Sequence, residues 1–109
     1  MKFMVLYRSS ASAEEQMGAN FTSQQREAAM AKWMEWFGRA GKQVLDGGGP
    51  FGTSRLVADS ADQPPGSHIG GYTILECASW EDVMALLAGH PHFESPDAAI
   101  EVLECLPMS

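Results

Sequence analysis

The sequence is poor in cysteine, histidine and basic residues. Its 109 residues include 2 cysteines, 3 histidines, and 7 Lys plus Arg against 14 Asp plus Glu, which gives a net charge of −7. Nucleic-acid and anionic-membrane binding depend on clustered Lys and Arg, so we expect neither as a partner. The apolar run Phe3–Tyr7 is too short for a signal peptide, and no run approaches transmembrane length. We therefore expect a cytoplasmic protein.

The two cysteines, Cys77 and Cys105, lie inside apolar, strand-like runs. Neither belongs to a CxxC pair or to another spacing typical of metal ligands. Unpaired cysteines of cytosolic proteins are usually buried and reduced. We therefore predict two buried thiols, no metal and no cofactor.

The length suits one domain that spans residues 1–109. Lys2–Tyr7 reads as a strand, and Thr22 opens a helix as N-cap, with Gln25 three residues later as in a capping box. The helix ends near Gly41. Its apolar stripe comprises Met30, Trp33, Met34, Phe37 and Val44. Trp36 lies off this stripe, which predicts that it faces a second buried surface such as a partner subunit.

Three further strands and one helix follow, and they complete the domain. The strands are predicted at Thr53–Ala58, Ile69–Cys77 and Ala99–Leu106, and the helix opens at Ser79 and ends at Gly89. The segments Ser9–Phe21 and Asp59–His68 read as loops. The glycine run after Asp46 indicates a tight bend or a close approach of two backbones.

The element order is β-α-β-β-α-β, which predicts an α+β, ferredoxin-like fold. Two helices can cover only one face of a four-stranded sheet. The other face would still carry apolar side chains from three strands, and an exposed apolar face of that size implies a partner. A second copy about a two-fold axis is the simplest partner. We therefore expect a homodimer with the architecture of a dimeric α+β barrel.

The stretch Gly89-His90-Pro91-His92 holds two of the three histidines at the end of a predicted helix. Three roles are open: capping the helix end, acid–base chemistry in a pocket, and metal binding, for which further ligands would be needed. Pro91 favours an extended backbone, which predicts that the rings point to opposite sides and that one enters a pocket. Asp46 is a candidate carboxylate partner for a histidine, or a turn cap before the glycines.

Four aromatic side chains could line a cavity or serve core and dimer packing. They are Trp33, Trp36, Phe37 and Tyr72.

The sequence resembles the YCII-related (DGPF-domain) family of dimeric α+β barrel proteins over nearly its whole length. The matching pieces are Met1–Tyr7, the DGPF variant Asp46–Phe51, Gly70–Glu76, Gly89–His92 and Ile100–Glu104. The resemblance implies a small cytoplasmic homodimer. Some members carry a His/Asp pair suggested to be catalytic, and one is a dehydrochlorinase of a chlorinated aromatic. Here His90 stands where some relatives have Asp, and Met30 lies near the place of a first-helix histidine.

Two functional hypotheses follow. The first is a small enzyme with lyase-type or dehydrochlorinase-like acid–base chemistry on a small apolar or aromatic metabolite, bound in a cleft of the dimer. Its candidate catalytic residues are His90, His92 and Asp46. The second is a non-catalytic protein that binds a small molecule or serves as an accessory protein.

Overall fold

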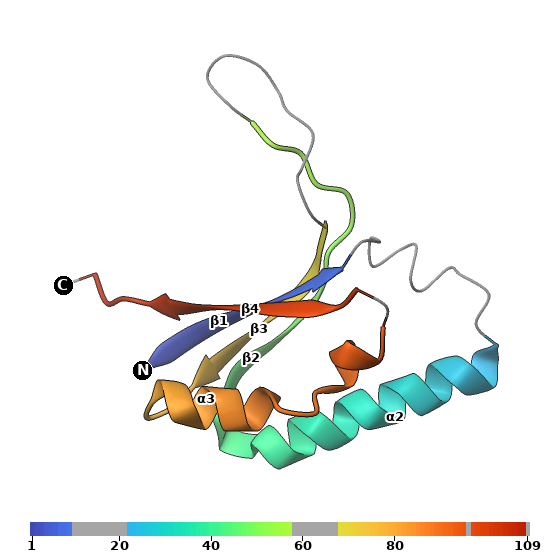
Figure 1. The fold of residues 1–109 in the computed structure, drawn as a ribbon, viewed down its shortest axis with the longest axis horizontal. Coiled ribbons are helices and arrows are strands. Elements are labelled where there is room, and N and C mark those ends of the chain that lie inside the picture. The colour runs from blue at the N-terminus through green and yellow to red at the C-terminus, as the bar shows by residue number, and fades with distance from the viewer. Residues whose placement is uncertain (10–21, 58–67, 96, 109) are drawn as a thin grey trace.

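The protein forms one four-stranded antiparallel sheet with two helices on one of its faces (Figure 1). The computed structural model describes residues 1–9, 22–57, 68–95 and 97–108. The strands are β1 (Lys2–Ser9), β2 (Val44–Pro50), β3 (His68–Glu76) and β4 (Ala99–Cys105), and their order in the sheet is β2-β3-β1-β4. This is the predicted α+β, ferredoxin-like topology. The predicted loop residues 10–21 and 59–67 lie outside the described residues.

The core lies between the sheet and the helices. In β1, buried residues alternate with partly exposed ones, so that Phe3, Val5 and Tyr7 face the helices. A strand with one covered face shows this alternation. The remaining buried apolar side chains are Trp36, Ala40, Leu75, Cys77, Val83 and Leu87.

The first helix, α2 (Ser23–Ala40), begins where the capping box predicts. Thr22 Oγ1 accepts a hydrogen bond from Gln25 N at 3.1 Å, and Gln25 Oε1 accepts one from Thr22 N at 2.8 Å. The prediction for Trp36 is wrong: its side chain is 2% exposed and belongs to the core. Met30 and Met34, assigned to the core stripe, are each 61% exposed. Only the C-terminal half of α2 packs on the sheet.

A short 3₁₀ turn, η1 (Gly41–Gln43), leads into β2, and the predicted strand Thr53–Ala58 is wrong. The strand lies at Val44–Pro50 and includes the glycine run, whereas residues 53–57 are exposed and form only an isolated bridge at Leu56. The expected close approach does occur. Gly48 has a φ of +70°, and a Cβ there would lie 1.8 Å from the carbonyl oxygen of Tyr72.

The second helix, α3 (Trp80–Leu87), is capped by Ser79, whose Oγ accepts from Asp82 N at 3.2 Å. Gly89 follows the helix with a φ of +73°. The predicted extended backbone after Pro91 is wrong, because Pro91–Glu94 forms a 3₁₀ helix, η2. A proline favours an extended backbone at the residue before it, and His90 is indeed extended. The proline itself suits the first position of a helix, where Pro91 stands.

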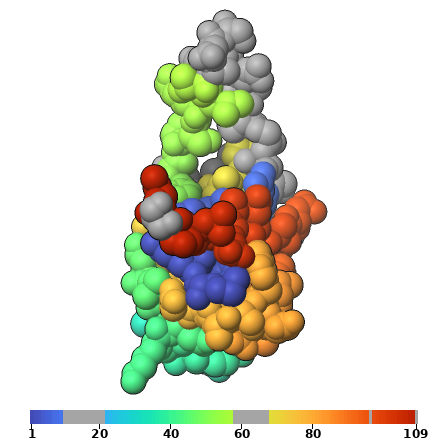
Figure 2. Space-filling view, turned by 90° about the vertical axis from the view of Figure 1, so that its left-hand side faces the viewer, coloured from blue at the N-terminus to red at the C-terminus, as the bar shows by residue number. Residues whose placement is uncertain are grey.

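No helix of the described residues lies on the sheet face opposite α2 and α3 (Figure 1). Ile74, Met4 and Leu103 stand in register across β3, β1 and β4 on this uncovered face. Residues 51–57 rise from the sheet on the same side, away from the helices (Figure 2). Neither of the described α-helices is long and apolar enough to cross a membrane.

Candidate functional site

Two buried histidines form the centre of the site. His90 is 1% exposed and His92 is 6% exposed. Both rings pack against Tyr7 of β1, with ring centroids 5.1 and 5.3 Å from its ring. The expectation that the rings point to opposite sides is wrong, because η2 turns the chain after Pro91 and brings them to the same side. Trp33 and Trp36 enclose His90 at centroid distances of 4.7 and 4.4 Å.

His90 uses both of its ring nitrogens. The His92 backbone N–H donates to His90 Nδ1 at 3.0 Å, so Nδ1 carries no proton. A neutral ring then has its proton on Nε2, and this N–H donates to the Tyr7 hydroxyl at 3.4 Å. His90 therefore caps η2 through its side chain. This is a capping role, although for the helix that follows and not for the helix before it.

The hydrogen bonds continue from Tyr7 into the sheet. Because Tyr7 Oη accepts from His90, its own proton goes to Thr73 Oγ1 at 2.8 Å. The Thr73 hydroxyl in turn donates to the carbonyl oxygen of Gly47 at 3.2 Å. The donors all run in one direction, from the η2 turn through β1 and β3 to β2. This chain satisfies the buried polar atoms, as burial away from water requires.

Burial shifts the acid–base properties of this chain. Burial raises the pKa of Tyr7 to about 12, partly offset by the hydrogen bond with Thr73. The pKa of His90 falls to about 4, mainly because burial disfavours its charged form, with smaller contributions from the charges of His92 and Arg39. Both groups are therefore neutral at physiological pH.

His92 differs from His90 in having a free ring nitrogen. Its Nε2 lies 2.9 Å from the carbonyl oxygen of Arg8, which can only accept, so Nε2 carries a proton and donates. No described hydrogen bond involves Nδ1. Among the described residues, no buried side-chain nitrogen or oxygen lacks a partner. The Nδ1 atom of this 6% exposed side chain therefore keeps a small contact with solvent and is the ring nitrogen left to accept a hydrogen bond.

Asp46 lies on the other face of the sheet. It pairs in register with Ile74 on the uncovered face. Its Oδ1 accepts from Gly48 N at 2.8 Å, and its Oδ2 accepts from the Tyr72 hydroxyl at 3.3 Å. The charge of Asp46 is the main cause that raises the pKa of Tyr72. Within one chain, the structure thus brings the two histidines together and gives Asp46 the turn-capping contact that was its alternative role.

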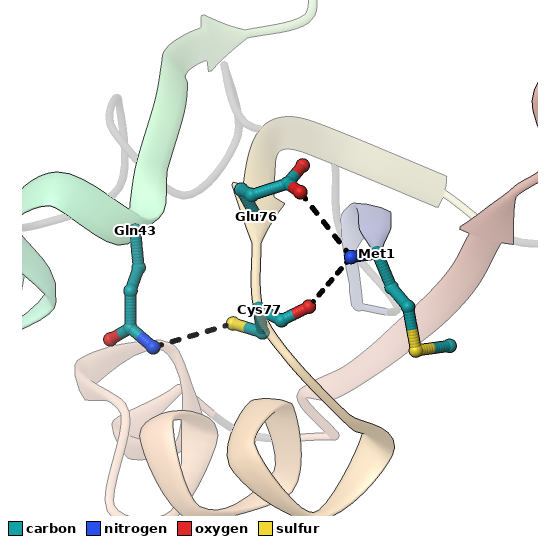
Figure 3. Close-up of polar contacts among 4 residues, drawn as sticks. All are labelled: Met1, Gln43, Glu76 and Cys77. Atoms are coloured by element: carbon teal, nitrogen blue, oxygen red, sulfur yellow. Dashed lines mark hydrogen bonds and ion pairs between the residues drawn. The ribbon is translucent and has the colours of Figure 1, made fainter.

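Both cysteines are free thiols. Cys77 is buried at the end of β3, where its Sγ accepts a 3.7 Å hydrogen bond from Gln43 Nε2 (Figure 3). Burial is the main cause that raises the pKa of Cys77, which keeps it protonated and a poor nucleophile. The amino group of Met1 donates to the carbonyl oxygen of Cys77 at 2.8 Å and pairs with the exposed Glu76 carboxylate (Figure 3). Cys105 is only partly buried, against the expectation.

Tyr7 and Thr73 are site residues that the sequence did not single out. Both lie at helix-facing positions of central strands, where a buried hydroxyl needs a hydrogen-bond partner. A hydroxyl at such a position of a predicted strand is the sequence signal that could have identified them. Of the four aromatic candidates, Trp33, Trp36 and Phe37 pack together on the helix side, whereas Tyr72 stacks on Phe51 on the uncovered side. In the described part of the chain, no three His, Cys, Asp or Glu side chains gather as metal ligands.

The fold is shared with an enzyme of known structure. No protein-family model matches the chain, and no curated protein matches it significantly. Among solved structures, the chain is similar to the 5-chloro-2-hydroxyhydroquinone dehydrochlorinase TftG from Burkholderia phenoliruptrix, in complex with 2,5-dihydroxybenzoquinone. The TM-score is 0.58 with 20% sequence identity, and the alignment covers 97% of this chain and 94% of the dehydrochlorinase. At this identity the similarity establishes the common ferredoxin-like fold.

Proposed function

We propose that the chain is a small enzyme of the YCII-related family that performs lyase-type acid–base chemistry on a small apolar or aromatic metabolite. The observation that carries the proposal is His92, whose Nε2–H is anchored on the carbonyl oxygen of Arg8 while Nδ1 has no hydrogen-bond partner among the described residues. A histidine oriented through one nitrogen and free at the other is suited to be a general base. The fold shared with a dehydrochlorinase supports this chemistry.

The proposed roles divide between the two histidines. In a dehydrochlorination the substrate loses a proton to the base and a chloride ion that leaves with the C–Cl bonding electrons. His92 Nδ1 takes the proton. His90 keeps the Tyr7 hydroxyl oriented and stays neutral, because its pKa of about 4 is too low for it to hold a proton at physiological pH. Asp46 could act only from the uncovered face, at a site that a second copy helps to form.

The test is chloride release from 5-chloro-2-hydroxyhydroquinone by the wild-type chain and two variants. His92→Asn removes the open Nδ1, and loss of a general base lowers kcat by roughly 10²- to 10⁴-fold. His68→Asn is the matched control, because it makes the same change in β3, outside the cluster. Equal turnover by His92→Asn and the wild type would refute the assignment of the base.

A non-catalytic role is the second candidate, and the bonding of His90 favours it. Both of its ring nitrogens are used, and its ring is almost fully covered, as in a histidine that serves structure alone. Under this alternative, 2,5-dihydroxybenzoquinone binds to the chain and is recovered unaltered. His92→Asn would then leave the affinity unchanged, and no chloride would be released by any variant.

We also propose that the chain acts as a homodimer in the cytoplasm. The row of Ile74, Met4 and Leu103 on the uncovered face supports sheet-to-sheet pairing, and the exposed Leu56 and Val57 stand beside that face. Reduced thiols are typical of the cytoplasm, which agrees with the two free cysteines. A second copy would bury the apolar row and bring each Asp46 close to the other chain.

A further inference from the structure

A groove of about 260 Å³ lies between α2 and the turn that follows α3, next to the histidine cluster. Its walls come from two elements that contact each other, α2 and η2 (Figure 1). The lining residues are Lys32, Glu35, Trp36, Arg39, Gly89, Pro91 and Glu94. Neither His90 nor His92 lines it, but Trp36, which packs on His90, does, so the groove lies beside the site described above.

The charges in the groove are not equally available. Lys32 Nζ pairs with Glu94 Oε1 at 2.6 Å and so joins α2 to η2 along one side. Arg39 makes no ion pair with any described residue. Trp36 contributes ring surface only, because its indole N–H already donates to the carbonyl oxygen of Leu86 at 2.9 Å. The guanidinium of Arg39 is therefore the free polar donor of the groove.

We propose that this groove binds a small organic carboxylate, with Arg39 as its anchor. A guanidinium offers parallel N–H donors that match the two oxygens of a carboxylate. The volume lies below the roughly 300–1,000 Å³ of pockets for drug-sized ligands, so the ligand is of about single-ring size. The lining carries two basic side chains, Lys32 and Arg39, and two acidic ones, Glu35 and Glu94. Because Lys32 pairs with Glu94, Arg39 is the cation of the lining that is left to meet an anion.

The proposal is tested by titrating the isotopically labelled full chain with benzoate and, separately, with uncharged benzyl alcohol. Saturable NMR shifts are expected with benzoate at the Gly89 amide and the Trp36 indole N–H, which lie in the groove wall. Benzyl alcohol is expected to give weak, unsaturated shifts, because it lacks the second oxygen and the charge. Equal shifts with both compounds, or benzoate shifts confined to other residues, would overturn the proposal.

Two variants locate the anchor. Arg39→Gln is expected to weaken benzoate binding by about 10- to 100-fold, the range for loss of a hydrogen bond to a charged group. Lys42→Gln makes the same change of charge outside the groove lining and is expected to leave the affinity within about twofold of the wild type. The anchor is wrong if both variants weaken binding equally. A readout of binding alone keeps this result independent of any turnover at His92.

Discussion

Acidification should destabilise the fold through His90. The unfolded chain has an ordinary histidine pKa of 6.5, whereas burial lowers that of folded His90 to about 4. Above pH 6.5 both states hold a neutral ring. As the pH falls below this value, the ring of the unfolded state becomes protonated while the ring of the folded state stays neutral. The free energy of unfolding therefore decreases until the folded ring also titrates near pH 4.

The magnitude follows from the two pKa values. Each unit of difference corresponds to about 1.4 kcal/mol, so protonation linked to His90 can lower the free energy of unfolding by at most roughly 3.5 kcal/mol over the whole window. By about pH 5 the loss is about 2 kcal/mol relative to about pH 7.5. That is a large fraction of the roughly 5–15 kcal/mol that stabilise a typical domain.

Urea unfolding followed by tryptophan fluorescence measures this loss, with His90→Asn as the reference. Asparagine keeps an oxygen that can accept from the His92 N–H, but it does not titrate. The 14 carboxylates titrate in both proteins and cancel in the difference. The stability gap between wild type and His90→Asn should shrink by about 2 kcal/mol between about pH 7.5 and about pH 5.

Parallel pH curves for the two proteins would refute the reasoning. If His90→Asn does not fold, the wild type alone decides the matter, because the NMR shift of the His90 Hε1 proton reports the charge of the ring. A ring that is still neutral at about pH 5 supports the argument. A ring that is protonated there contradicts it.

Two further predictions concern the edge strand and the uncovered face. Gly48→Ala should lower the free energy of unfolding in urea by at least about 2 kcal/mol, because the added Cβ would meet the Tyr72 carbonyl and the φ is +70°. Gly49→Ala is the control: there is open space around the added Cβ, so the free energy of unfolding should change by less than about 1 kcal/mol. The wild type should elute at about twice 11.8 kDa with light-scattering detection. Leu103→Lys should give a monomer, because it places a charge on the uncovered face. Met34 is an exposed apolar residue on the helix side, so Met34→Lys should leave the dimer intact. A monomeric wild type would contradict the dimer.

The features that the sequence predicted correctly depend on local chemistry. The caps at Thr22 and Ser79 satisfy the free N–H groups of a helix start by contacts three residues away, so a short window of sequence contains the whole signal. The strand predicted at Lys2–Tyr7 depends likewise on a short run of neighbouring apolar residues. The order of elements then limits the topology to few choices, and the ferredoxin-like sheet is one of them.

The features that it missed depend on contacts between distant residues. Glycines carry no side chain that could mark a strand face, so the edge strand at Val44–Pro50 was hidden. It forms because β3 offers a free edge, and Gly48 lets the two backbones approach. The exposure of Met30 depends on how far α2 extends beyond the sheet. Helical periodicity predicts which face of a helix is apolar, but not which part of its length contacts the sheet.

The histidine pair shows how one local turn decides the chemistry of a site. An extended chain after Pro91 would place the rings on opposite sides and leave each with its own surroundings. The 3₁₀ turn instead makes the backbone N–H of His92 the partner of His90, which fixes the tautomer of His90 and, through Tyr7, the direction of every hydrogen bond to Gly47. The same turn presents His92 to the carbonyl oxygen of Arg8. Two histidines that are equivalent in the sequence thus differ in the fold: both ring nitrogens of His90 are hydrogen-bonded, whereas His92 has no described hydrogen bond at Nδ1.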